Sequence, residues 1–213
     1  MQKNSTTRLP LMSDIDRRTA MMGAASLGTV ALLAPQPAAA LAVKDAENLI
    51  RQVTREVQSI INSGQSQAAL IRKFEGVFQK YADVPRIAAT LLGPPWRSAN
   101  SADRTAYVRA LTGYLARKYG KRFREFTNAE ISITKSKDLG KKGVIVETLI
   151  RTSVYAPFPV EWWVIDDGRK RSFFDIIIEG VRLQSAERGE IRALLDRSGG
   201  SVSKLAATLN QLG

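Results

Sequence analysis

Asp175 is the side chain in this sequence best suited to do chemistry, because it interrupts the apolar run KRSFFDIIIEGVRL at residues 170–183. A carboxylate held among apolar side chains can have a raised pKa and act as a general base. The same carboxylate can instead be structural, accepting hydrogen bonds from a neighbouring loop or pairing with an arginine, since buried polar groups are normally satisfied. We favour the structural role and therefore predict no catalytic residue in this chain.

The other candidate groups offer little further chemistry. Asp166 and Asp167 stand next to Gly168, where a turn is the simpler interpretation of two adjacent carboxylates. The chain has no cysteine and no histidine, so it lacks thiol chemistry, disulfides and the commonest general base and metal ligand near neutral pH. Its sequence contains no phosphate-binding loop, nucleophile elbow or zinc-protease motif. We predict neither a metal site nor a cofactor.

Asp175 belongs to a strand-rich segment, residues 129–182. Its own run has aromatic and β-branched side chains of both parities, which is typical of a strand at the heart of a sheet. Strand-like runs at 143–155 and 159–166 precede it, and an Asp-Gly turn follows the second run. Residues 130–137 alternate like an edge strand with lysines outside. The segment predicts a four-stranded antiparallel meander.

Helical segments flank this meander. Residues 43–128 are mainly helical by the spacing of their apolar side chains, starting with Val43–Ile61, and residues 183–213 contain two more helices. Asp83, Ser185 and Ser201 are expected N-caps. Each apolar stripe is interpreted first as ordinary core and only second as a candidate for ligand contact. Helices, one antiparallel meander, then helices again predict the α+β class.

Residues 1–42 have the anatomy of an export signal. The pair Arg17-Arg18 precedes a weakly apolar, uncharged run that ends at Leu33, and small residues follow up to Ala42. The paired arginines predict twin-arginine export, with cleavage near Ala40 or Ala42 and a periplasmic location. The apolar run is shorter than the ~20 residues that span a bilayer. An N-terminal anchor that is never cleaved is the alternative.

The charge balance is strongly basic. The sequence has 32 Lys and Arg residues against 20 Asp and Glu residues, a formal net charge of +12. This excess favours anionic partners such as phospholipid headgroups or acidic protein surfaces. Nucleic acid is anionic too, but an exported protein is not expected to meet it, so we predict no nucleic-acid partner.

Two motifs carry a family resemblance. The first is Leu92-Gly93-x-x-Trp96-Arg97-x-Ala99, followed by Ser-Ala-Asp-Arg at 101–104 and by Leu115 to Tyr119 and Phe123. The second is Phe174-Asp175, three isoleucines, Glu179-Gly180-Val181, and then Leu183 and Arg188. Together they resemble the signature of the MlaC (toluene-tolerance) family over essentially all of residues 43–213. The resemblance implies structural roles for Gly93, Trp96, Arg97, Asp175, Glu179, Gly180 and Arg188.

Three positions depart from the family pattern. Arg171 stands where the family usually has Trp, Arg182 stands in place of Ser, and Glu187 stands in place of Tyr. These changes concern the local contacts around the second motif and the docking surface for partners. They leave the expected apolar cavity unchanged, because its wall is built from apolar bulk.

The resemblance implies a fold and a function. The fold is an NTF2-like cone, in which a curved sheet and added helices enclose a deep cavity that hides the acyl chains of a phospholipid. The function is that of a periplasmic carrier, which moves phospholipid between an outer-membrane lipoprotein–porin complex and an inner-membrane ABC transporter complex and so maintains outer-membrane lipid asymmetry. Phospholipid is then the cargo rather than a cofactor, and the protein is not an enzyme.

Strand parity predicts which face forms the cavity wall. Glu147 and Arg151 lie on one face of their strand, so the opposite face is expected to point inward. The predicted wall consists of the residues on that inward face of three strands, with three aromatic residues from the helical part: Val144, Val146, Ile150, Val160, Trp162, Val164, Phe174, Ile176, Ile178, Trp96, Tyr119 and Phe123.

Two other functions compete with the carrier. An NTF2-like cone enzyme, an isomerase or dehydratase acting on a small apolar substrate, would use Asp175 as its base. A non-enzymatic adaptor would instead bind a periplasmic protein through its basic face.

Overall fold

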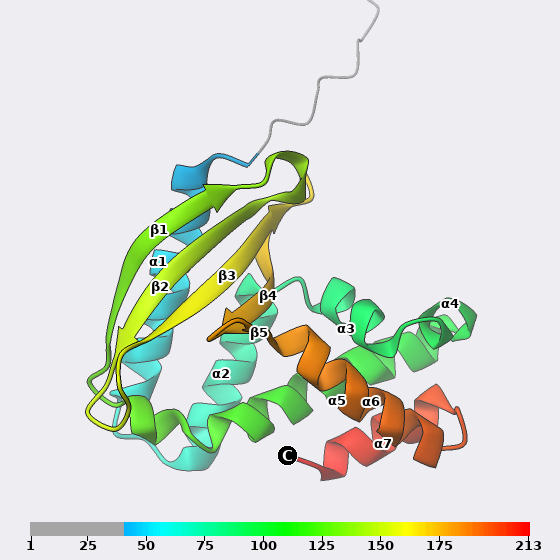
Figure 1. The fold of residues 1–213 in the computed structure, drawn as a ribbon. Helices are drawn as coiled ribbons and strands as arrows, with labels where there is room; N and C mark the ends of the chain where they lie inside the picture. The colour runs from blue at the N-terminus through cyan, green and yellow to red at the C-terminus, as the bar shows by residue number, and fades with distance from the viewer. Residues whose placement is uncertain (1–40) are drawn as a thin grey trace, which may run out of the picture. The chain divides into compact units, whose positions relative to one another are not determined.

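Five helices, an antiparallel meander and two further helices follow one another along residues 41–213, the part of the chain that this computed structural model describes (Figure 1). The α+β class predicted from the sequence is confirmed. The helices are α1 (Val43–Ile61), α2 (Gln67–Tyr81), α3 (Val84–Leu92), α4 (Pro95–Ser98), α5 (Ser101–Gly120), α6 (Leu183–Arg197) and α7 (Val202–Gln211). The strands are β1 (Glu130–Asp138), β2 (Val144–Arg151), β3 (Phe158–Asp166), β4 (Arg171–Ile178) and β5 (Val181–Arg182).

The predicted export signal lies outside the described residues, apart from Leu41 and Ala42. No helix within residues 41–213 combines the length and the apolar character that a membrane span needs.

The sheet has five strands in the order β1-β2-β3-β4-β5, all antiparallel, rather than the four predicted. The additional strand arises from Glu179 and Gly180, whose φ angles are 50° and 81°. A two-residue turn with positive φ at both positions folds the chain back tightly. It places Val181 opposite Ile178, and the run that was predicted as one strand becomes β4, a turn and β5.

The strand that carries Asp175 is therefore not central. The sheet order puts β3 in the middle, and β4 lies next to the short β5. Beyond β5, the chain enters α6, which packs against β4. A single parallel bridge between Ala82 and Phe173 also ties the end of α2 to β4. Packing on these sides explains why β4 is apolar at both parities although it is nearly at the edge.

Helix α1 lies against the inward face of the sheet and contacts β1 to β4 (Figure 1). Its apolar stripe places Ala46 and Ile50 in one continuous core with residues of β2 and β3, and both side chains are fully buried. Helices α2, α3, α5, α6 and α7 contribute buried residues to the same core. Burial of this shared apolar surface is what holds the sheet and the helices together.

Most of the predicted helix starts are correct. Asp83 caps α3 and Ser201 caps α7, each accepting a hydrogen bond from a backbone N–H three residues further on. The prediction for α6 was wrong, because this helix begins at Leu183 and Ser185 lies inside its first turn.

Candidate functional site

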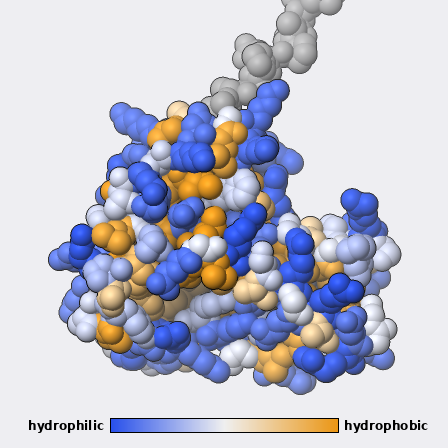
Figure 2. All heavy atoms as spheres, in the orientation of Figure 1, coloured by the Kyte–Doolittle hydropathy of each residue, from blue (hydrophilic) through white to orange (hydrophobic). Residues whose placement is uncertain are grey.

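An apolar cavity of about 630 Å³ lies between the inward face of the sheet and the helices. This volume is in the range typical of small-molecule sites. Helices α1, α2 and α3 contribute Val53, Val57, Ile61, Phe74, Val77, Phe78, Ile87 and Leu91 to its lining, and residues of α5 and α6 complete the helical part. Figure 2 shows a hollow between the lower part of the sheet and the helices below it, bordered by apolar residues.

Eight of the twelve predicted wall residues line this cavity: Ile150, Val160, Trp162, Phe174, Ile176, Ile178, Tyr119 and Phe123. They come from β2, β3, β4 and the end of α5 with the turn that follows it. The antiparallel register explains why the strand residues meet, since Val160 lies opposite Ile178 and Trp162 lies opposite Ile176. Contact between these residues and a lipid stays a prediction.

Val144, Val146 and Val164 do not line the cavity, although they have the predicted parity. All three are fully buried and belong to the core cluster that includes the first half of α1. This half of α1 fills the space against the upper part of the sheet. From Val53 onward the same helix lines the cavity instead.

Trp96 lies outside the cavity as well. It belongs to the short helix α4, where Arg104 stacks over its ring at 5.5 Å and donates a hydrogen bond of 2.8 Å to its carbonyl oxygen. Arg104 also donates to the carbonyl oxygen of Arg97 at 2.9 Å. These contacts make Trp96 part of the connection between α3 and α5, and its placement in the wall was wrong.

A β-bulge changes the parity at Phe174. The register shifts between Trp163 and Val164, so that Asp175 lies opposite Trp163 while Phe173 lies opposite Val164. Phe173 therefore turns inward, with its ring 5.5 Å from that of Trp162. Phe174 borders the cavity, but its ring packs on Trp163 at 5.2 Å. Phe173 is the cavity residue at this level that parity counting missed.

The indole N–H of Trp162 has a hydrogen-bond partner within the sheet. Its Nε1 donates a hydrogen bond of 3.0 Å to the hydroxyl of Thr148, which donates in turn to the carbonyl oxygen of Val160 at 3.1 Å. Thr148 is fully buried on the same face of the sheet. The indole can therefore present its apolar ring to a ligand without leaving a polar group unpaired.

Asp175 is 3% exposed and its carboxylate is fully engaged. Oδ1 accepts hydrogen bonds from the backbone N–H groups of Ile176 at 3.0 Å and Gln184 at 3.3 Å, while Oδ2 accepts from Arg182 Nε at 2.7 Å. The carboxylate thus joins β4, β5 and the start of α6. This geometry is that of a structural acceptor, because neither oxygen is free to take a proton from a substrate.

A second ionic group joins α5 to α6 at the cavity wall. Lys118 Nζ lies 2.8 Å from Glu187 Oε1 and 2.6 Å from Glu190 Oε2, and the Tyr119 hydroxyl also donates to Glu187. Burial alone would lower the pKa of Lys118, but the hydrogen bonds to both glutamates outweigh burial and raise it. Burial raises the pKa of Tyr119, and its hydrogen bond to Glu187 raises it further.

A polar cluster lies at the exposed border of the cavity. Arg122 Nε lies 3.0 Å from Glu125 Oε2, and the Tyr155 hydroxyl donates to the same carboxylate. The Arg122 guanidinium also stacks on the Tyr155 ring at 5.5 Å. Arg122 and Tyr155 line the cavity, so this cluster marks where its apolar wall reaches solvent.

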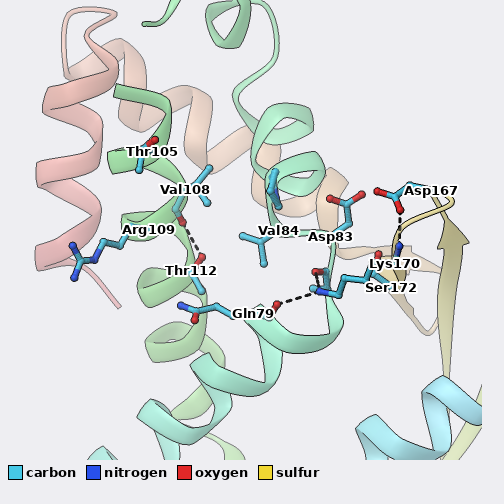
Figure 3. A pocket seen from close by; sticks show the side chains of 12 residues that line it. Gln79, Asp83, Val84, Thr105, Val108, Arg109, Thr112, Asp167, Lys170 and Ser172 are labelled. Atoms are coloured by element: carbon cyan, nitrogen blue, oxygen red, sulfur yellow. Dashed lines mark hydrogen bonds between the residues drawn. The ribbon is translucent and has the colours of Figure 1, made fainter. Parts of the chain in front are cut away.

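A second pocket, of about 490 Å³, opens between the α2–α3 junction, α5 and the β3–β4 turn (Figure 3). Several of its polar side chains are hydrogen-bonded within the protein. Lys170 Nζ donates to the carbonyl oxygens of Gln79 at 3.3 Å and Ala82 at 3.4 Å, and the Thr112 hydroxyl donates to the carbonyl oxygen of Val108 at 2.7 Å. This pocket is more polar than the first, so the first is the better site for an apolar ligand.

Asp167 borders this second pocket as a turn residue. Its Oδ1 accepts hydrogen bonds from the backbone N–H groups of Lys170 at 2.8 Å and Arg169 at 2.9 Å. These bonds lower the pKa of Asp167 and stabilise its ionised form. Within residues 41–213 there is also no cluster of three or more acidic residues arranged to hold a metal ion.

The comparison with protein families identifies the family of this chain. The family model described as MlaC protein matches residues 51–211. The chain belongs to the MlaC family. The solved structures include the phospholipid-binding protein from Ralstonia solanacearum in complex with a phospholipid, with a TM-score of 0.68 and 16% sequence identity. The match covers 78% of this chain and 95% of that chain, and at this identity it shows a shared fold.

The motif residues of this MlaC family member lie in three places. Gly93 ends α3 with a φ angle of 70°, which disfavours any residue with a side chain. Asp175, Glu179 and Gly180 shape the β4–β5 turn and the start of α6. Arg97 and Arg188 are exposed.

The three departures from the family pattern all form ion pairs. Arg182 pairs with Asp175, and Glu187 pairs with Lys118. Arg171 bridges Asp45 and Asp166, each at 3.2 Å.

Proposed function

We propose that this MlaC family member is a phospholipid carrier that shields acyl chains in the cavity between its sheet and α1, α2 and α3. The observation that carries the proposal is the cavity itself, about 630 Å³ in volume and walled mainly by aromatic and aliphatic side chains. Moving a methylene group from water into such surroundings is favourable by ~0.8 kcal/mol. The phospholipid complex of the Ralstonia solanacearum protein, which shares the fold, supports the same cargo class.

The cellular setting is part of the proposal. The twin-arginine signal in residues 1–42 would deliver the protein to the periplasm. There it would move phospholipid between an outer-membrane lipoprotein–porin complex and an inner-membrane ABC transporter complex, as its family membership suggests. Replacing Arg17 and Arg18 by lysine should retain the precursor in the cytoplasm, and cell fractionation would show this.

Native mass spectrometry of the purified protein tests the carrier. We expect a co-purified phospholipid that raises the mass of the chain and is released by organic extraction. A matched pair of variants controls for the site. Val57→Trp places a bulky ring on the cavity-lining side of α1 and should reduce the bound lipid, whereas Arg188→Ala, at an exposed residue of α6, should leave it unchanged. Protein that stays free of lipid after incubation with phospholipid vesicles would contradict the carrier.

A further inference from the structure

An arginine with unused hydrogen-bond donors stands at the exposed border of the cavity. Arg122 is the only basic residue among those that line the cavity in residues 41–213. Its side chain is 64% exposed, its Nε donates to the Glu125 carboxylate at 3.0 Å, and its Nη2 donates to the Tyr155 hydroxyl. Nη1 has no partner within the same residues. Both N–H groups of Nη1 and the second N–H of Nη2 therefore remain available to a ligand.

Aromatic side chains connect this arginine to the cavity interior. The ring centroids of Phe158 and Phe126 are 6.4 Å apart, and those of Phe126 and Tyr155 are 6.2 Å apart. All three residues line the cavity, and the Arg122 guanidinium stacks on the last ring at 5.5 Å. The row lies where the loop joining β2 to β3 meets the turn after α5 (Figure 1). An amphiphile fits such a border, because its apolar part contacts the rings and its polar part reaches solvent.

The charges around Arg122 favour an anionic group. Lys121 and Arg124 flank it and are exposed, and Arg151 is exposed where β2 ends and this loop begins. Glu125 is the one acidic residue in the segment 121–125. Because the cations outnumber the anion, the local field attracts a negative charge.

The acidic residues of the cavity lining do not cancel this field. Asp175 is buried and paired with Arg182. Glu187 is buried and paired with Lys118. Glu179 is exposed in the β4–β5 turn, where solvent and salt screen its charge.

We infer that Arg122 binds the phosphate group of the lipid headgroup while the acyl chains lie beyond the aromatic row in the cavity. This inference rests on the proposed carrier function and makes Arg122 a specificity-determining residue. The planar guanidinium suits phosphate, because two of its N–H groups can donate to two phosphate oxygens at once. Free inorganic phosphate offers the same oxygens, but the position of Arg122 beside an apolar wall favours a phosphate that is attached to acyl chains.

Two lipids with the same acyl chains test the contact. Dioleoyl phosphatidylglycerol carries a phosphate-containing headgroup, and dioleoylglycerol does not. Each lipid displaces a fluorescent diacylglycerol from the delipidated protein, and the ratio of the two dissociation constants measures the headgroup preference. Arg122→Gln should reduce this preference by about threefold to tenfold, the range expected for hydrogen bonds between charged groups at an exposed site. It should leave the affinity for dioleoylglycerol nearly unchanged.

Further variants separate a direct contact from a change of charge. Arg122→Gln also leaves Glu125 without its ion pair, and this carboxylate would then repel an anion. The double variant Arg122→Gln with Glu125→Gln keeps the net charge of the parent and should lose the preference too. Glu125→Gln alone should keep or strengthen it. Arg124→Gln is the matched control and should keep the preference, because Arg124 lies in the same turn, does not line the cavity and donates to the carbonyl oxygen of Gln65.

The outcomes separate this inference from the carrier function. A headgroup preference that survives in Arg122→Gln or in the double variant would overturn the inference and leave the carrier intact, as would an equal loss in Arg124→Gln. Inorganic phosphate should bind the delipidated protein far more weakly than the phospholipid does. Phosphate binding of equal strength that is lost in Arg122→Gln would assign the site to a free anion and overturn the headgroup contact. A parent protein that binds neither lipid would overturn the carrier function itself.

Discussion

Arg182 places two guanidinium nitrogens 2.7 Å from the same carboxylate oxygen of Asp175. The Asp175 side chain is fully buried, whereas that of Arg182 is 43% exposed and stacks over the ring of Trp163 at 4.9 Å. The pair closes the β4–β5 hairpin at the point where the chain enters α6. The carboxylate that was the strongest candidate for chemistry is thus held by the turn that follows it.

Asp175→Asn should destabilise the fold without emptying the cavity. The change removes the ion pair and leaves a buried hydrogen-bond network disturbed, at a cost of ~1–3 kcal/mol. In thermal unfolding this corresponds to a fall in Tm of several degrees. Asp196→Asn, at an exposed residue of α6, is the control and should have little effect. If Asp175→Asn were as stable as the parent but had lost a measurable turnover of a small apolar substrate, the enzyme alternative would be favoured instead.

Burial of tyrosines should make the protein sensitive to alkali. Burial raises the pKa of Tyr114 to about 12, and it also raises that of Tyr107, which is fully buried with no partner for its hydroxyl in the described residues. The folded pKa then lies above the unfolded value near 10. Stability is therefore fully present below pH ~10 and declines as the pH rises from there, because only the unfolded chain loses its protons.

Tyr107→Phe isolates this effect. It should be neutral or slightly stabilising at pH 7, because it removes a buried hydroxyl without a partner. Between pH 10 and 12 it should lose less stability than the parent, which denaturant titrations at several pH values would show. An identical alkaline decline in both proteins would mean that Tyr107 ionises freely in the folded state.

The basic turns at one end of the sheet should accelerate docking. Lys141, Lys142 and Arg169 are exposed in the turns that join β1 to β2 and β3 to β4, which lie together at the upper end of the sheet (Figure 1). Exposed charges attract an acidic surface or an anionic bilayer over about 8 Å at physiological salt. Replacing all three by glutamate should slow association with anionic vesicles and leave the bound lipid unchanged.

Two neighbouring cations are excluded from that variant for a structural reason. Arg171 is paired with Asp45 and Asp166, and Lys170 donates to carbonyl oxygens at the end of α2. Association rates measured from low to high salt check the prediction. Rates that do not depend on salt in the parent protein would show that these charges serve solubility alone.

Local sequence patterns predicted most of the fold, but only part of the cavity wall. Alternation in β2 correctly assigned Val146 and Glu147 to opposite faces of the sheet, because side chains alternate with a period of two and one face of the strand is apolar. The prediction of a structural role for Asp175 came from the high cost of an unpaired buried charge, and the hydrogen bonds and ion pair of its carboxylate agree with it. Neither inference needed to know where any other element would pack.

What the sequence could not predict depends on contacts between distant elements. The sequence of β2 does not indicate that the first half of α1 covers Val144 and Val146 and leaves Ile150 open to the cavity. The bulge at Trp163 and Val164 has no glycine to mark it, so the parity count missed Phe173 as a cavity residue. The stripes of α1, α2 and α3 have the same spacing whether they fill a core or line a cavity, so their part of the wall was missed.

Photo-crosslinking tests most directly whether lipid occupies the cavity between α1 and the sheet. A photoreactive residue at Ile176 or Val57 should capture phospholipid, because both side chains line the cavity. The same residue at Val146 should not, since that side chain is buried against α1, and neither should it at Glu147 on the other face. Mass spectrometry of the crosslinked chains identifies the adducts. Lipid captured at Ile176 and Val57 alone is the result we predict, and equal capture at all four positions would contradict the account.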